Sequence, residues 1–332
     1  MIRWLDEIVK NEIKKPLPIL SFPGVQLISM TVKEMIESPE NQANCMRAIA
    51  DKFDSAASVS LMDLSVEAQA FGSSVKFSDS EVPTVIGMIV ETEEDAENLK
   101  IPAVGDGRTG ICIKAIELAK SYITDRPILA GVIGPFSLAG RLMGMTEIMV
   151  NCLVEPELTH MVLAKACEFI KRYILALKEA GANGIVIAEP AAGLLSPEVC
   201  EAFSSVYVKS IIEAVQDDQF IVIYHNCGNT LPLIDSLLGV GAKAYHFGNA
   251  VDIGAVLDKM PNNIPVLGNL SPADHFKGGT PESVAIATKE MLTKTVGHKN
   301  YIPSSGCDIP PQSPMENIEA FFASVKGFYS NH

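Results

Sequence analysis

Short apolar runs alternate with longer amphipathic stretches over most of the 332-residue chain. The apolar runs predict buried strands at 128–133, 184–187, 220–224, 244–247, 265–267 and 301–302. Between them, apolar positions recur at helical spacing, as in the stretch that Pro156 opens and Gly181 ends. Strands and helices that alternate in this way predict β/α units arranged around a parallel sheet.

The number of these units favours an α/β barrel. Six units follow residue 128, and one or two precede it, since 58–62 is a further strand candidate. Together they fit an eight-stranded (β/α)8 TIM barrel. A doubly wound open sheet is the alternative, but its nucleotide-binding forms are not supported, because neither a Gly-x-Gly-x-x-Gly turn nor a phosphate loop is present. No linker divides the chain, so 1–332 is predicted to be one domain, with 1–55 as a peripheral, helical N-terminal extension.

One predicted strand end carries the strongest chemical signal. His225 and Cys227 stand two residues apart behind the run 220–224, which places both side chains on one face of an extended backbone. Cys307 follows another apolar run and is the best candidate for a third ligand. Two thiolates and one imidazole, with one position open, form a known catalytic zinc arrangement. Buried cysteines are also often plain hydrophobes, but the other five cysteines lack this setting at a strand end.

Other polar residues also stand at expected strand ends, where a barrel gathers its chemistry. They are Asp63, Glu189, His246, Asn249 and Asn269. Each has a structural alternative, because such residues cap helices and hold loops, and this alternative is favoured for the two asparagines. Glu189 and His246 are candidates for a fourth metal ligand or a substrate contact, and water is the remaining option.

Composition narrows the class of protein. With 48% hydrophobic residues the chain can bury a large core. The net charge of −14 disfavours nucleic acid and anionic membranes as partners. Seven cysteines without a dense framework favour a reducing environment, and neither a signal peptide nor an apolar stretch of about 20 residues is visible. We therefore expect a soluble cytoplasmic protein, with a homo-oligomer as an open option.

Several segments resemble the uroporphyrinogen decarboxylase superfamily and, within it, the methylcobalamin:coenzyme M methyltransferase branch. Gly-Pro-Phe at 134–136 and Gly-Asn-Leu at 268–270 resemble the superfamily, and His-x-Cys at 225–227 with the late Cys307 resembles its zinc methyltransferases. The resemblance covers most of the chain. It implies Zn²⁺ on His225, Cys227 and Cys307, methylcobalamin as methyl donor on a corrinoid carrier protein, and a small thiol such as coenzyme M as acceptor.

The resemblance also separates the branches. The decarboxylases carry an arginine-rich N-terminal signature for the carboxylates of the porphyrinogen, but the corresponding stretch 18–24 has no arginine. The whole chain has six arginines, so decarboxylation of a porphyrinogen is disfavoured. Corrinoid-independent methyl transfer to a thiol, and a barrel that only binds a ligand, are the other hypotheses.

Two alternatives concern the surroundings of the expected metal site. In the methyltransferases an acidic residue can complete the zinc shell, whereas the strand after His-x-Cys has no carboxylate here. If the thiol is acidic, Arg108 is the candidate to hold it, with a surface arginine in a turn as the alternative. Asp63 and Asn249 are further candidate contacts to substrate or corrinoid.

Overall fold

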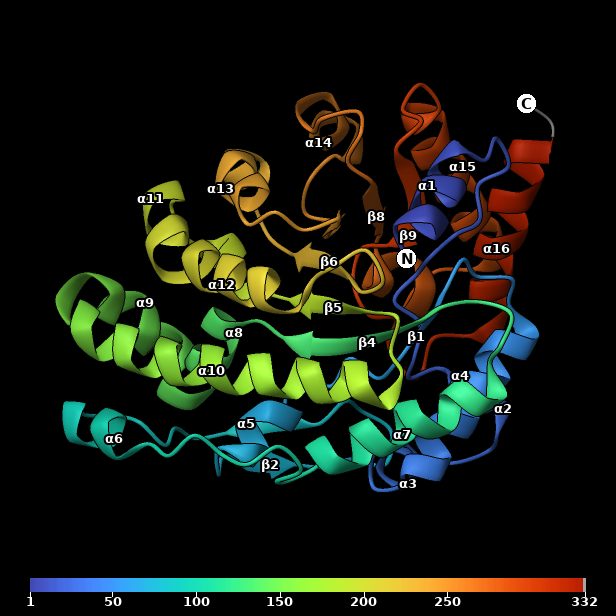
Figure 1. Ribbon diagram of the computed structural model, residues 1–332. Helices are drawn as coiled ribbons and strands as arrows, with labels where there is room; N and C mark the ends of the chain where they lie inside the picture. Colours follow the sequence, from blue (N-terminus) through green and yellow to red (C-terminus); the bar gives the residue numbers. More distant parts are fainter. Residues whose placement is uncertain (331–332) are drawn as a thin grey trace.

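The computed structural model describes residues 1–330 and contains one curled parallel sheet of seven strands (Figure 1). Along the sheet the order is β1-β4-β5-β6-β7-β8-β9. The strands are β1 Ser58–Val59, β4 Ile128–Ile133, β5 Gly184–Ala188, β6 Ile221–Asn226, β7 Ala244–Phe247, β8 Val266–Leu270 and β9 Tyr301–Ser305. The order rises with the sequence and never reverses, so the doubly wound alternative is wrong. The six predicted units after residue 128 are confirmed.

Helices surround this sheet on its outer face and at one end of the barrel. They are α1 Ile2–Lys10, α2 Gly24–Leu27, α3 Val32–Ile36, α4 Pro39–Lys52, α5 Val66–Ala70, α6 Glu93–Asn98, α7 Thr109–Tyr122, α8 Pro135–Met143, α9 Met145–Val154, α10 Pro156–Ala180, α11 Pro197–Cys200, α12 Val206–Val215, α13 Ile234–Gly239, α14 Ile253–Lys259, α15 Pro281–Thr295 and α16 Met315–Ser330. Shorter helical turns are η1 Pro190–Leu194, η2 Glu201–Ser205, η3 Leu231–Leu233 and η4 Pro272–Lys277, and β2 Ser74–Lys76 pairs with β3 Thr84–Ile86 as a hairpin. Among residues 1–330, no helix has the length and apolar character needed to span a bilayer.

The core has two layers, one on each face of the sheet. The larger lies between the strands and the surrounding helices. The smaller fills the inside of the curled sheet with one or two inward-facing side chains from each strand, such as Leu129, Ile221, Ala244 and Ile302. Alternate residues of one strand face opposite sides, so a continuously apolar strand such as β4 serves both layers.

An extended N-terminal segment, 16–20, fills the seam between β9 and β1. The N–H of Leu17 donates to the carbonyl of Pro303 on β9 (2.9 Å), and the N–H of Ala56, just before β1, donates to the carbonyl of Pro16 (2.9 Å). Leu17 and Ile19 are buried in the inner layer. The prediction that 1–55 is peripheral is therefore wrong for this segment, which takes the place of an eighth strand. Its prolines lack N–H groups, so it cannot form a regular ladder.

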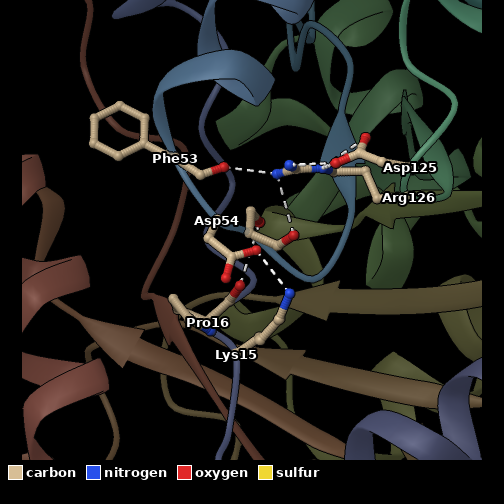
Figure 2. Close-up of polar contacts among 7 residues, drawn as sticks. Lys15, Pro16, Phe53, Asp54, Asp125 and Arg126 are labelled. Atoms are coloured by element: carbon tan, nitrogen blue, oxygen red, sulfur yellow. Dashed lines mark hydrogen bonds and ion pairs between the residues drawn. The ribbon is translucent and has the colours of Figure 1, made fainter.

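The end of the barrel where the strands begin is closed by α1 (Figure 1). Leu5 packs into the inner layer, and the N–H of Ile2 donates to the carbonyl of Asp218 ahead of β6 (3.2 Å). Figure 2 shows nearby contacts that fasten this end: Lys15 binds Asp54 (2.7 Å), and Arg126 donates to the carbonyl of Phe53 (2.6 Å). The opposite end, where the strands finish, remains for the functional groups.

Candidate metal centre

Three ligand-type side chains meet at the carboxyl end of the barrel. His225 is the next inward-facing residue of β6 after Ile221 and Ile223, and it is 1% exposed. Its Nε2 lies 3.1 Å from Sγ of Cys227 and 3.6 Å from Sγ of Cys307, which follows β9. The fold therefore brings together residues 82 positions apart in the sequence. All three ligand atoms lie within 4.8 Å of one another.

This cluster fits Zn²⁺ in both chemistry and spacing. Zinc takes thiolate sulfur at about 2.3 Å and imidazole nitrogen at about 2.0 Å, so ligand atoms in a tetrahedral shell lie roughly 3.5 Å apart. The observed separations of 3.1 and 3.6 Å are close to this value. Within residues 1–330, no carboxylate joins the cluster. Three protein ligands and one remaining position are typical of a catalytic rather than a structural zinc site.

A chain of hydrogen bonds across the barrel sets the orientation of His225. Ser304 on β9 donates its hydroxyl proton to the carbonyl of Leu17 (2.7 Å), so its oxygen accepts from Nε2–H of His246 (2.8 Å). Nδ1 of His246 is then an acceptor for Nδ1–H of His225 (2.7 Å). This tautomer leaves the lone pair of His225 Nε2 directed at the two sulfurs. An outer partner on the second ring nitrogen is the usual arrangement for a metal-binding histidine.

Burial agrees with a neutral His246. Loss of solvation and the neighbouring His225 lower the pKa of His246 well below its ordinary value. An uncharged ring can accept the proton of His225 Nδ1 while donating its own. Both ring nitrogens of His246 are thus engaged, and the side chain positions His225 instead of pointing at the sulfurs. Ser304 was not singled out in the sequence, because a serine at a strand end carries no signal of its own.

The two thiols behave as a pair. The hydrogen bond from Cys227 lowers the pKa of Cys307 well below its ordinary value, and the same hydrogen bond raises the pKa of Cys227. The pair therefore favours the thiolate at Cys307 over the thiolate at Cys227. A metal ion binds thiolates and releases the thiol proton. The arrangement is thus suited to exchange a proton for a cation.

Glycines allow the loop of Cys227 to pack closely. Gly228 has φ +82°, a left-handed conformation that other residues adopt only with strain. A Cβ on Gly193 would lie 1.6 Å from the carbonyl oxygen of Cys227, and a Cβ on Gly248 would lie 3.1 Å from its sulfur. The position of Cys227 therefore depends on two segments outside its own strand.

Glu189 lies elsewhere than the metal cluster. Its carboxylate accepts from the N–H groups of Phe136 (2.9 Å) and Ser137 (2.5 Å) at the start of α8. The side chain is fully buried, and burial raises its pKa to about 7. This contact joins the end of β5 to α8, the helix that follows the neighbouring strand β4. It uses both carboxylate oxygens.

Arg108 and Asp63 form a buried ion pair with each other. Nη2 of Arg108 also donates to Oγ of Ser65 (2.7 Å), and Nε donates to the side chain of Gln69 (2.7 Å). Arg108 is 5% exposed, so the alternative of a surface arginine is wrong. Each of its three nitrogens already donates to a protein side chain.

The two asparagines differ. Asn269 donates to the carbonyls of Gly248 (3.0 Å) and Val251 (2.7 Å), which confirms the predicted loop role. Asn249 is exposed and lies against Gly306, one residue before Cys307.

The comparisons with known proteins agree with this architecture. The family model described as uroporphyrinogen decarboxylase (URO-D) matches residues 24–328. The chain therefore belongs to the uroporphyrinogen decarboxylase family.

Relatives within this family carry two kinds of name. A methylcobamide:CoM methyltransferase, MtbA, from Methanosarcina acetivorans is 32% identical over 270 residues, which cover 80% of this chain and 78% of the relative. A uroporphyrinogen decarboxylase from a Synechococcus species is 28% identical over 219 residues, covering 63% of this chain and 60% of the relative. Among solved structures, a methyltransferase from Methanosarcina mazei superposes with a TM-score of 0.86 at 23% identity and covers 98% of both chains. That last likeness concerns the fold.

Proposed function

We propose that this protein is a zinc-dependent methyltransferase that moves a methyl group from a methylated corrinoid to a small thiol. The observation that carries the proposal is the cluster of His225 Nε2 and the sulfurs of Cys227 and Cys307 at the carboxyl end of the barrel. Similarity to the methylcobamide:CoM methyltransferase of Methanosarcina acetivorans supports the corrinoid donor and coenzyme M as a candidate acceptor.

The residues around the cluster have separate tasks in this reaction. Zn²⁺, bound by the triad, would supply a Lewis acid that favours the thiolate form of the substrate at neutral pH. His246 keeps the lone pair of His225 toward the metal position. Two cysteinates in place of neutral ligands keep negative charge near the substrate sulfur, which preserves its nucleophilicity.

The transfer balances without a further reactant. A sulfur–carbon bond forms as the cobalt–carbon bond of methyl-cob(III)alamin breaks, and the electron pair of that bond stays on cobalt as cob(I)alamin. The proton of the thiol leaves to solvent. The corrinoid is too large for a closed pocket, so we expect it on a carrier protein that docks over the carboxyl end.

Porphyrinogen decarboxylation fits the residues less well. The stretch 18–24 has no arginine, and 19–24 are buried with Leu17 against the barrel instead of lining an open cleft. A substrate with eight carboxylates needs several fixed cations. The buried Arg108 is already paired with Asp63.

The proposal is tested by metal analysis together with the absorbance change of methylcobalamin on addition of thiols. Wild type should hold one zinc per chain and form cob(I)alamin only when a thiol is present. Cys307→Ala should lose both properties. Cys152→Ala, which alters a buried cysteine on α9, is the matched control and should keep both.

Each failure has a distinct meaning. Protein purified with zinc supplied that holds none contradicts the metal centre. Bound zinc with no methyl transfer to any thiol rejects the donor or the acceptor, and the homologous decarboxylase activity is then measured.

A further inference from the structure

A cavity of about 330 Å³ lies at the carboxyl end of the barrel. Its wall includes Met62 and Leu64 after β1, Arg141 from α8, Lys277 from η4 and Asp308 after β9, and the β2–β3 hairpin loop completes it. Asp308 directly follows Cys307, so one wall adjoins the metal centre. The volume suits a small molecule.

Arg141 is the notable residue of this cavity. It is partly buried, yet within residues 1–330 its guanidinium has no hydrogen bond or ion pair with the protein. Burial lowers the pKa of Arg141, which reports the loss of solvation of its charge, and the more distant Asp63 opposes that shift. Buried charges are normally paired. An unpaired arginine that faces a cavity therefore indicates an anionic ligand.

The other charges of the cavity are engaged differently. Lys277 lies 3.7 Å from Glu81, and both side chains are substantially exposed at the rim. Asp308 accepts from Oγ of Ser21 (3.4 Å). Asp63 is the acid whose charge raises the pKa of Arg141, and it already binds Arg108. Of the two cations in this wall, Arg141 is therefore the one whose N–H groups have no acceptor among residues 1–330.

We propose that Arg141 binds the acidic group of the thiol substrate, a sulfonate or a carboxylate, and so selects anionic thiols over neutral ones. This inference rests on the proposed methyl transfer. The planar guanidinium offers two parallel donors to either oxyanion. Met62 and Leu64 provide apolar contact for the carbon chain between the acid and the sulfur. Arg141 would thus have the role that the sequence analysis assigned to Arg108, namely to bind the acidic group of the thiol.

The first experiment compares Michaelis constants of three thiols in wild type and in Arg141→Gln. The thiols are 2-mercaptoethanesulfonate, 3-mercaptopropionate and the neutral 2-mercaptoethanol. For the acid that the site prefers, the KM should rise roughly 10- to 100-fold in the variant, as expected for loss of a charge-assisted hydrogen bond. The KM for 2-mercaptoethanol should change less than about 3-fold, since it makes no such bond.

Two further variants serve as controls for this experiment. Arg141→Lys keeps the charge but loses the fork, so its KM should lie between those of wild type and Arg141→Gln. Arg172→Gln removes an exposed arginine of α10 that pairs with Glu168, and its constants should equal those of wild type. Equal changes for acidic and neutral thiols in Arg141→Gln, or no change, overturn the proposal.

A second readout does not depend on methyl transfer. Calorimetric titration with ethanesulfonate and with propionate, neither of which has a thiol, should show binding of at least one to wild type and a loss of at least 10-fold in affinity in Arg141→Gln. If wild type transfers no methyl group but this binding holds, the proposed function fails and the anion site stands. If neither anion binds wild type, or the variant binds as well, the anion site is rejected.

Discussion

The two ends of the barrel are built from the same strands and differ sharply in chemistry. Along β6 the inward-facing residues are Ile221, Ile223 and then His225. At the first end, Leu5 of α1 closes an apolar layer. At the second, imidazoles, thiols and the guanidinium of Arg141, which has no partner in the part of the chain that the structure describes, are held at or below the surface. The change occurs within two residues of one strand.

The two ends of the barrel contribute differently to the stability of the fold. The apolar layer at the closed end is stabilised by burial of aliphatic side chains. The carboxyl end contains groups whose pKa values are displaced by burial, such as Glu67, Glu189 and His246. Substitutions at the two ends should therefore affect different quantities.

The largest effect is expected for Cys227→Ala. Loss of a first-sphere sulfur should weaken zinc binding by more than about 100-fold, because even an outer partner is worth roughly 10- to 100-fold. Methyl transfer should fall with it. Zinc titration against a chelator measures the affinity, and circular dichroism serves as the check on folding. Zinc affinity equal to that of wild type would reject Cys227 as a ligand.

Leu5→Ala should show the reverse pattern. Leu5 is 5% exposed and fills the closed end, so truncation should lower the free energy of unfolding by about 2–5 kcal/mol. Zinc affinity should stay within about 2-fold of wild type, since the metal centre lies at the other end. Urea denaturation gives the stability. Val9→Ala, a partly buried neighbour in the same helix, should cost less.

Glu67→Gln should stabilise the protein at high pH. Burial, helped by the nearby Asp63, raises the pKa of Glu67 to about 7, while one oxygen accepts from the N–H of Ile133 (3.1 Å). A raised folded-state pKa gives stability that is full below about pH 4.5 and lost as pH rises through about 7. The amide mimics the protonated acid. The variant should match wild type near pH 5 and exceed it by up to about 3 kcal/mol near pH 8.

Urea denaturation at several pH values separates this effect from that of other acids, because only the difference between variant and wild type is compared. Glu282→Gln, an acid in the first turn of α15 on the surface, is the control and should leave the pH profile unchanged. A constant difference between Glu67→Gln and wild type from pH 5 to pH 8 would show that Glu67 is ionised throughout this range.

The smallest effect is expected for His246→Phe. The ring keeps its volume, but His225 loses the acceptor for its Nδ1–H (2.7 Å). Zinc affinity should fall roughly 10- to 100-fold. His298→Phe, which alters a histidine paired with Asp258 near the surface, should change nothing at the metal. A phenylalanine variant with full zinc affinity would contradict the positioning role.

Much of the fold could be predicted from the sequence because the signal is local. The strands at 128–133 and 244–247 agree with β4 and β7 residue for residue, since short apolar runs between helices have few other solutions. The segment 16–20 lacks such a local signal. Its prolines remove the strand signal, and only its hydrogen bonds to Pro303 and Ala56 reveal its place in the barrel.

The cluster of His225, Cys227 and Cys307 was also predictable, whereas its surroundings were not. His225 and Cys227 share one strand end, Cys307 follows another, and the three together resemble the ligand pattern of zinc methyltransferases. Arg141 gave only a weak signal, a single charge in the apolar segment 135–143. That it has no protein partner among residues 1–330 becomes visible only in the folded chain.

The β/α alternation, the parallel sheet and the candidate ligands His225 and Cys227 could be inferred without coordinates, because each depends on residues close together in the chain. The folded chain was needed to show that Arg108 pairs with Asp63, that Arg141 has no protein partner within residues 1–330, and that Ser304 and His246 orient His225. These relations join residues on different strands and helices. They depend on which side chains the closed barrel brings within about 3 Å, the range in which hydrogen bonds and ion pairs act.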